Sequence, residues 1–299
     1  TLLAMVSGYA MERHQFGEPI GSFGLIKQKI GNMVVDCYAT ESTVQMMAAL
    51  ADRGYEDFSV EAAITKIYAT EALWRTADEA LQTAGGTGYM REYPYERVLR
   101  DCRINRIYEG TNDILRLYVA LTALNDVGQR LKEMAGSLRG IFDDPIKGFG
   151  LLYDYAKRRA VWATGIPASA SSMGKAHLAL RPEADIFEDL ARDLAAMADR
   201  LLRKHGKNII GKQFATRRLA DVMIDLWVLA CVLSRVTAAI ESNGANGAAE
   251  ETHIARILAR QVRERARRNF RRIDDNDDEL VKGLAEAAYE RGGYGWDVL

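Results

Sequence analysis

A carboxylate stands beside a glycine, just before a helix start, in the segment from Tyr108 to Arg116, which reads Tyr-Glu-Gly-Thr-Asn-Asp-Ile-Leu-Arg. Thr111 is a natural N-cap for the amphipathic helix that follows. Glu109 then lies just outside the first turn, where unpaired backbone N–H groups and the helix dipole favour its ionised form. Gly110 lets a substrate approach the backbone closely. The arrangement suits a catalytic base, although acidic residues near helix starts more often only tune helix stability.

Two further segments precede this one. The segment from Arg13 to Ile20 reads Arg-His-Gln-Phe-Gly-Glu-Pro-Ile, and the segment from Gln82 to Tyr89 reads Gln-Thr-Ala-Gly-Gly-Thr-Gly-Tyr. In this order, the three segments resemble the Arg-x-x-Phe-Gly turn, the Gln-x-x-Gly-Gly-x-Gly-aromatic turn and the catalytic segment of the acyl-CoA dehydrogenases. The resemblance covers residues 1–125 densely, and the helical tail beyond them is similar to the very-long-chain branch of that family.

The resemblance implies α,β-dehydrogenation of a long-chain fatty acyl-CoA, with FAD as the hydride acceptor. Glu109 would be the general base that removes the α-proton, and Gly110 would face the substrate thioester. The family also implies electron-transferring flavoprotein as the acceptor of the electrons from FAD. The competing interpretation is a non-catalytic helical module used for dimerisation or membrane docking.

Four of the implied FAD contacts come from the two turns. Arg13 matches an arginine that pairs with the cofactor pyrophosphate across the dimer interface, a task suited to a bidentate guanidinium. Phe16 would lie against the same cofactor. Gln82 and Gly86 match the second turn, where missing side chains let the backbone approach the adenosine-diphosphate part. Taken singly, Arg13 and Gln82 are more simply explained by a salt bridge and a cap, so the joint pattern carries the inference.

Three more FAD contacts are implied elsewhere. Thr111 and Asp113 would flank the nucleotide from the helix start. Many family members carry a glutamine eight residues after the Phe-Gly aromatic, whereas the run from Phe23 to Ile26 has no amide side chain. The very-long-chain branch shares this departure, so Gln213 in the tail is the candidate replacement. Its alternative is an ordinary first-turn helix residue exposed to water.

The composition is that of a globular chain with no strong charge bias. Its 299 residues allow one or two domains, and 48% hydrophobic residues are enough for a sizeable core. A formal net charge of −1 argues against nucleic-acid binding. The three cysteines are widely spaced and the four histidines are scattered, so we expect reduced core cysteines in a cytoplasmic protein and no metal site.

Neither a secretory leader nor a membrane span is expected, because we find no apolar run of about 18–20 residues. The first residues, Thr-Leu-Leu-Ala-Met-Val, read as the middle of a helix without a cap. Family members have an N-terminal helical domain and a β-domain before the region that this chain resembles. We therefore expect a truncated chain that is catalytically inactive alone and binds FAD weakly or not at all.

Helical periodicity dominates the first 125 residues. Apolar side chains recur at three- and four-residue steps over 23–52 and 59–82, which predicts two long amphipathic helices. The glycine-rich turn at 85–88 is expected to end the second helix, and Pro94 to open a shorter one that reaches Arg103. Because alternating β-branched runs are absent, little or no sheet is expected. The prediction is an all-α, antiparallel bundle of long helices over residues 1–125.

Glycine and proline interrupt residues 126–182, which we interpret as a connector. Apolar residues flank a basic cluster at 157–159 within it. This combination would suit peripheral contact with an anionic membrane surface, and the alternative is a loop packed over its own bundle.

Residues 183–299 predict a second helical bundle, with helices over about 184–204, 212–241 and 248–271 and a turn at 242–247. The third helix is rich in arginine and precedes a block of acidic residues, so the two blocks are expected to neutralise one another on a solvated face. Nucleic-acid binding by these arginines ranks last, because no aromatics are interleaved. A second bundle would occupy the face that smaller family members use to form tetramers, which favours a homodimer.

Overall fold

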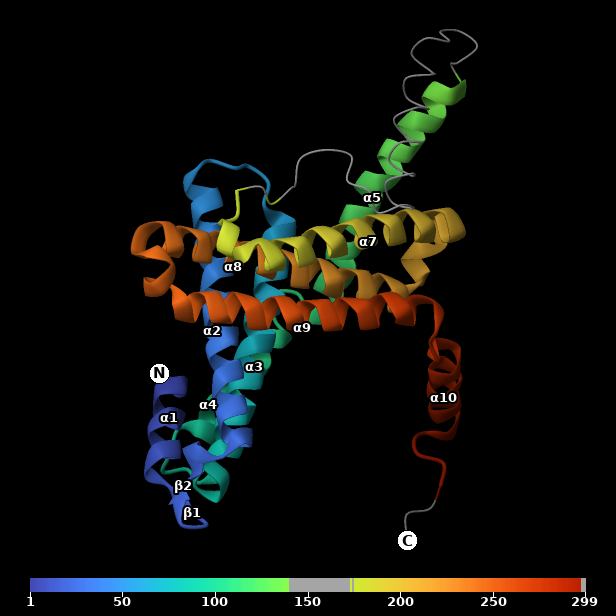
Figure 1. The fold of residues 1–299 in the computed structure, drawn as a ribbon. Helices are drawn as coiled ribbons and strands as arrows, with labels where there is room; N and C mark the ends of the chain where they lie inside the picture. The colour runs from blue at the N-terminus through green and yellow to red at the C-terminus, as the bar shows by residue number, and fades with distance from the viewer. Residues whose placement is uncertain (140–172, 174, 297–299) are drawn as a thin grey trace.

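The computed structural model of the chain describes residues 1–139, 173 and 175–296, and almost all of these are helical (Figure 1). The described sheet is a hairpin of two two-residue strands, so the prediction of an all-α fold with little or no sheet is confirmed. The main elements are, in chain order, α1 (Leu2–Glu12), β1 (His14–Gln15), β2 (Glu18–Pro19), α2 (Gly24–Asp52), α3 (Ser59–Tyr89), α4 (Tyr95–Arg103), α5 (Asn112–Arg139), α7 (Arg181–His205), α8 (Gln213–Gly247), α9 (Ala249–Asp274) and α10 (Asp278–Arg291).

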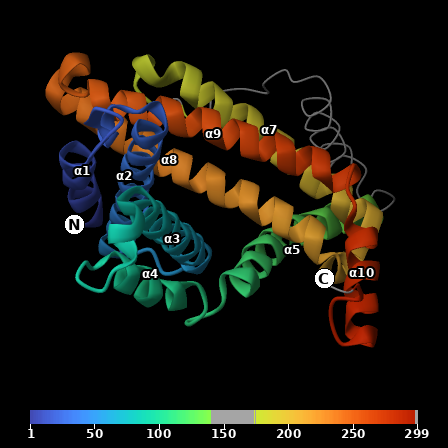
Figure 2. The ribbon, with the colours of Figure 1, turned by 90° about the horizontal axis from the view of Figure 1, so that it is seen from below.

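The first half is built on α2 and α3, which lie side by side (Figures 1 and 2). Both predicted long helices are confirmed, and α3 continues past residue 82 to Tyr89. The glycine-rich segment kinks α3 rather than ending it, which corrects the predicted turn at 85–88. Gly85 leaves helical geometry with φ 60° and ψ −141°, and the helix then resumes.

Replacing Gly85 with alanine is expected to lower the free energy of unfolding by about 1–3 kcal/mol, because this φ and ψ are essentially closed to a residue with a Cβ atom. Gly86 is the matched control, since its φ is not positive and an added Cβ would meet no atom within 4 Å. Gly86→Ala is expected to leave stability unchanged or raise it, because alanine favours helix. Urea denaturation of both variants tests this, and equal losses would contradict it.

The second half crosses the first. Helices α7, α8 and α9 run across α2 and α3 rather than along them (Figure 1). The three predicted helices of the second bundle are confirmed, and helical geometry breaks inside the predicted turn at 242–247. The break is at Gly244 (φ 73°, ψ 165°), and a short helical stretch then runs to Gly247, where α8 ends. The sequence reading also missed α10.

One buried cluster joins the two halves. Val35 of α2 and Ile67 of α3 belong to the same hydrophobic cluster as Leu229 of α8 and Leu258 of α9. Two smaller clusters flank it, one under α1 and one around Ile209. The helical bundles therefore bury part of their apolar faces against each other.

Helix α8 corrects the expectation that no segment is long and apolar enough to cross a membrane. Within the described part of the chain, α8 alone passes that test by length and composition. More than half of its most apolar stretch is buried among the other helices. The core helix of a globular bundle has the same character, so its composition is explained by its central position.

The cysteines are unpaired. Cys102 and Cys231 are buried and Cys37 is partly exposed, as expected for free core thiols. Burial raises the pKa of the Cys231 thiol to about 12, so it is fully protonated at neutral pH.

The predicted connector is described only at its ends. Helix α5 runs to Arg139, past residue 126, so the glycine at 136 does not end the helix. Residues 140–172 and 174 lie outside the described part, and so does the basic cluster at 157–159.

The arginines of α9 do not neutralise the acidic block that follows them, which corrects that expectation. Asp274 pairs with Arg200 of α7 at 2.6 Å, and Asp278 pairs with Arg218 of α8 at 2.5 Å. Two of the α9 arginines instead hold buried acids on other helices: Arg265 pairs with Asp225 and Arg256 with Glu183.

Candidate active site

The Glu109 loop has an unusual backbone. Glu109 and Gly110 both have positive φ, 55° and 87°. Among the described residues, Glu109 and Phe16 are the non-glycine residues with positive φ, and both are candidates from the sequence. Side chains with a Cβ atom are strained in this region, and such strain concentrates at functional sites. The backbone conformation therefore marks both residues independently as candidates for a functional role.

Thr111 caps α5 as predicted. Its hydroxyl oxygen accepts a hydrogen bond from the backbone N–H of Ile114 at 3.2 Å. Asp113 lies exposed in the first turn of α5, where its negative charge interacts favourably with the positive end of the helix dipole. Gly110 is required for two reasons, since its φ is positive and an added Cβ would lie 3.0 Å from a methyl carbon of Leu115.

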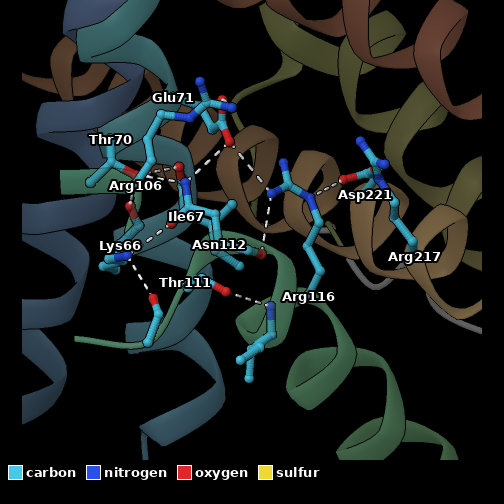
Figure 3. A network of polar contacts seen from close by, with 12 residues as sticks. Lys66, Ile67, Thr70, Glu71, Arg106, Thr111, Asn112, Arg116, Arg217 and Asp221 are labelled. Atoms are coloured by element: carbon cyan, nitrogen blue, oxygen red, sulfur yellow. Dashed lines mark hydrogen bonds and ion pairs between the residues drawn. The ribbon is translucent and has the colours of Figure 1, made fainter. Parts of the chain in front are cut away.

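Lys66 of α3 holds the loop (Figure 3). Its ammonium group donates to the carbonyl oxygen of Gly110 at 2.8 Å and to Oδ1 of Asn112 at 2.9 Å. Partial burial lowers the pKa of Lys66, and the charges of Glu71 and Glu109 oppose that shift. The charge of Lys66 thus lies within electrostatic reach of the candidate base. No local signal marked Lys66, because it precedes Gly110 by 44 residues.

The Glu109 side chain is exposed, and apolar side chains lie around it in the sequence. Four of these are also exposed: Ile104, Ile107, Tyr108 and Ile114. Exposed apolar side chains that gather on one surface mark sites that bind ligands or other protein, so these four residues are candidates for such a surface.

The segment from Arg13 forms the small hairpin. His14 faces Pro19 and Gln15 faces Glu18, so Phe16 and Gly17 are the two turn residues. Both have positive φ, which is the type I′ pattern for a two-residue hairpin loop. The turn presents the Phe16 ring to solvent, 93% exposed, with its edge toward Phe23. Arg13 is also exposed and makes no ion pair with a described residue.

The second candidate turn lies near the hairpin. The hydroxyl of Tyr9, on α1 just before the hairpin, donates to Oγ1 of Thr87 at 3.3 Å. Gln82 and Gly86 are exposed, and an added Cβ at Gly85 or Gly86 would meet no atom. This surface therefore leaves the backbone open to a ligand.

The hairpin end and the Glu109 loop are separate places on one chain. Lys66, which holds the loop, and Gly85 are both on α3. Nineteen helical residues at 1.5 Å each place them roughly 28 Å apart. Gln213 lies at a third place: it is the exposed first residue of α8, and the ring of the next residue, Phe214, lies 5.8 Å from the ammonium group of Lys282 on α10.

Comparisons with known proteins agree on one family. A model described as the acyl-CoA dehydrogenase C-terminal domain matches residues 2–124, and one described as the ACAD9/ACADV C-terminal domain matches residues 178–294. The very long-chain specific acyl-CoA dehydrogenase, mitochondrial, of Rattus norvegicus is 36% identical over 98% of this chain, and that of Homo sapiens is 37% identical over 98%. The match covers 45% of each relative, so the chain spans less than half their length.

A solved structure shares the arrangement of both halves. The acyl-CoA dehydrogenase from Bacillus anthracis, complexed with FAD, aligns with a TM-score of 0.74 at 25% identity. The alignment covers 95% of this chain and 48% of that one.

Proposed function

We propose that this chain, which belongs to the acyl-CoA dehydrogenase family and matches the C-terminal part of its relatives, comes from an active dehydrogenase. The whole protein would catalyse FAD-dependent α,β-dehydrogenation of a long-chain fatty acyl-CoA, with Glu109 as the general base. One observation carries the assignment of the base. Glu109 is an exposed carboxylate on a strained loop that Thr111 caps and Lys66 holds. A loop whose residues directly after Glu109 are held in this way can aim a carboxylate at one carbon.

In this proposal Glu109 removes the α-proton of the thioester onto its carboxylate, and Gly110 lies against the thioester. FAD, when bound, accepts the hydride from the β-carbon. Proton removal from a weak carbon acid needs a site without water. Because Glu109 is exposed among apolar side chains, another surface has to cover it. The 299-residue chain alone is therefore proposed to be inactive.

The residues present fit FAD. Arg13 offers an exposed guanidinium for a pyrophosphate, and Phe16 offers an exposed ring. Gln82 and Gly86 lie exposed on either side of the kink in α3 nearby. Together with Arg13, Phe16, Gln82 and Gly86, the proposed FAD-binding residues are Thr111, Asp113 and Gln213.

A homodimer accounts for the separation of the two groups of residues. Gly85, near the hairpin, and Lys66, which holds the Glu109 loop, are roughly 28 Å apart along α3, which supports the proposal that Arg13 of one chain serves the cofactor beside Glu109 of its partner. Electron-transferring flavoprotein is proposed as the electron acceptor. Cytoplasmic location and peripheral membrane contact stay predictions.

Purified full-length protein is expected to show the visible absorbance of bound flavin and to oxidise a long-chain acyl-CoA in the presence of an artificial electron acceptor. The 299-residue chain with added FAD is expected to show no turnover, because it spans less than half the length of its relatives and leaves Glu109 exposed. Full-length protein without flavin or turnover would favour the helical docking module instead. Turnover by the 299-residue chain would refute its proposed inactivity.

A further inference from the structure

A continuous set of polar contacts leads from the Glu109 loop to α8 (Figure 3). Lys66 donates to the Gly110 carbonyl and to Asn112. Asn112 donates to Glu71 at 3.1 Å, and Glu71 lies 3.5 Å from Arg116. Arg116 then donates through Nε to Oδ1 of Asp221 on α8 at 2.7 Å.

Asn112, the first residue of α5, is fixed by these contacts. It is 3% exposed, and its amide nitrogen donates to both Thr70 and Glu71. Its amide oxygen accepts from Lys66. An ammonium group can only donate and a carboxylate can only accept, so the amide has a single orientation that satisfies both. Rotation of Asn112 would leave buried polar groups without partners.

Arg116 fastens the first turn of α5 to the second bundle. Its side chain is 14% exposed, and Nη1 also donates to the carbonyl oxygen of Asn112 at 3.3 Å. Burial alone would raise the pKa of Glu71, but the Asn112 hydrogen bond and the charges of Arg116 and Arg106 outweigh it, and the pKa is lowered. Glu71 therefore stays ionised at neutral pH and continues to hold Asn112 and Arg116.

Close packing of side chains does not by itself hold Arg116 in place, so its ion pair with Asp221 matters. Glu71, Arg116 and Asp221 line a cavity of about 780 Å³ between α2, α3, α8 and α9. If Asp221 lost its charge, Arg116 would have room to move into that space, and the start of α5 would follow.

We propose that Asp221 is a positioning residue for the dehydrogenation: through Arg116 and Asn112 it fixes the start of α5 and so the direction of the Glu109 carboxylate. The second bundle then contributes to proton removal without touching the substrate. A small displacement of a reacting group carries a large rate cost, which is why a distant ion pair can matter. This inference rests on the function proposed above.

Asp221→Asn in the full-length enzyme tests the proposal, with Asp278→Asn as the matched control. Both acids pair with an arginine that is 14% exposed, and both ion pairs involve α8, but only that of Asp221 leads to the Glu109 loop. D221N is expected to lower kcat, measured on the flavin-loaded enzyme, about 5- to 30-fold, the factor that corresponds to about 1–2 kcal/mol. D278N is expected to keep kcat, whereas Asp221→Glu, which retains the carboxylate, is expected to recover part of it.

Hydrogen exchange in the 299-residue chain gives a readout without cofactor. The backbone amides of Ile114 and Leu115, which are bonded to Thr111, are expected to exchange about 5- to 30-fold faster in D221N than in D278N. Equal kcat values and equal exchange rates in the two variants would overturn the positioning role. A wild-type enzyme without flavin or turnover would instead refute the proposed function and leave the exchange result to be judged separately.

Discussion

Replacing Glu109 with glutamine in the full-length protein is expected to lower kcat for acyl-CoA dehydrogenation by about 10²–10⁴-fold, the usual contribution of a positioned general base. Glutamine keeps the size of the side chain but cannot accept the α-proton. The substitution is expected to be structurally mild, because Glu109 is exposed and both residues meet the same restriction at φ 55°. Steady-state turnover with a long-chain acyl-CoA measures the effect.

Two comparisons make this result specific. The variant is expected to retain the flavin absorbance of the wild type, because Glu109 is assigned to substrate and not to cofactor. Glu56→Gln, which changes an exposed glutamate in the loop between α2 and α3, is expected to leave kcat unchanged. If the Glu109 variant turned over at the wild-type rate, another residue would have to be the base.

The second large effect concerns the buried ion pair between α8 and α9. Arg265→Met is expected to lower the free energy of unfolding by about 3–5 kcal/mol, because it leaves an uncompensated buried charge on Asp225. Asp225 is only 7% exposed, and Arg265 donates to its two carboxylate oxygens at 2.7–3.1 Å. Chemical denaturation measures the loss. Arg260→Met, an exposed position on the same helix, is the control and is expected to change stability little.

The pH dependence of this loss identifies its cause. Burial raises the pKa of Asp225, and the charge of Arg265 opposes the rise. A carboxyl with a raised pKa in the folded state favours folding at acid pH and loses that contribution as pH increases through the raised value. Without Arg265 the pKa is expected to rise further. The destabilisation by Arg265→Met is therefore expected to be larger at about pH 7 than at about pH 5. A loss of stability that does not change with pH would mean that lost packing, and not the charge of Asp225, causes it.

Local patterns predicted much of the fold because they depend on nearby residues. An N-cap hydrogen bond joins residues only three positions apart, and Thr111 makes the predicted bond with the backbone N–H of Ile114. The glycine signals were less complete. They marked Gly85 and Gly244 as breaks, and both have positive φ, but the helix resumes after each. Gly88 has a different role, because a Cβ at this position would lie 2.7 Å from the Leu81 carbonyl oxygen, so this glycine permits close packing.

The sequence by itself determined the all-α class, the family and the candidate base, since each depends on the type and spacing of neighbouring residues. Only the tertiary structure decided which charges meet. Arg116 pairs with an acid 105 residues away, and Asp278 pairs with Arg218 rather than with the arginines that precede it. A guanidinium can pair with any carboxylate within reach, so the packing of whole helices, which no short segment specifies, selects the partner.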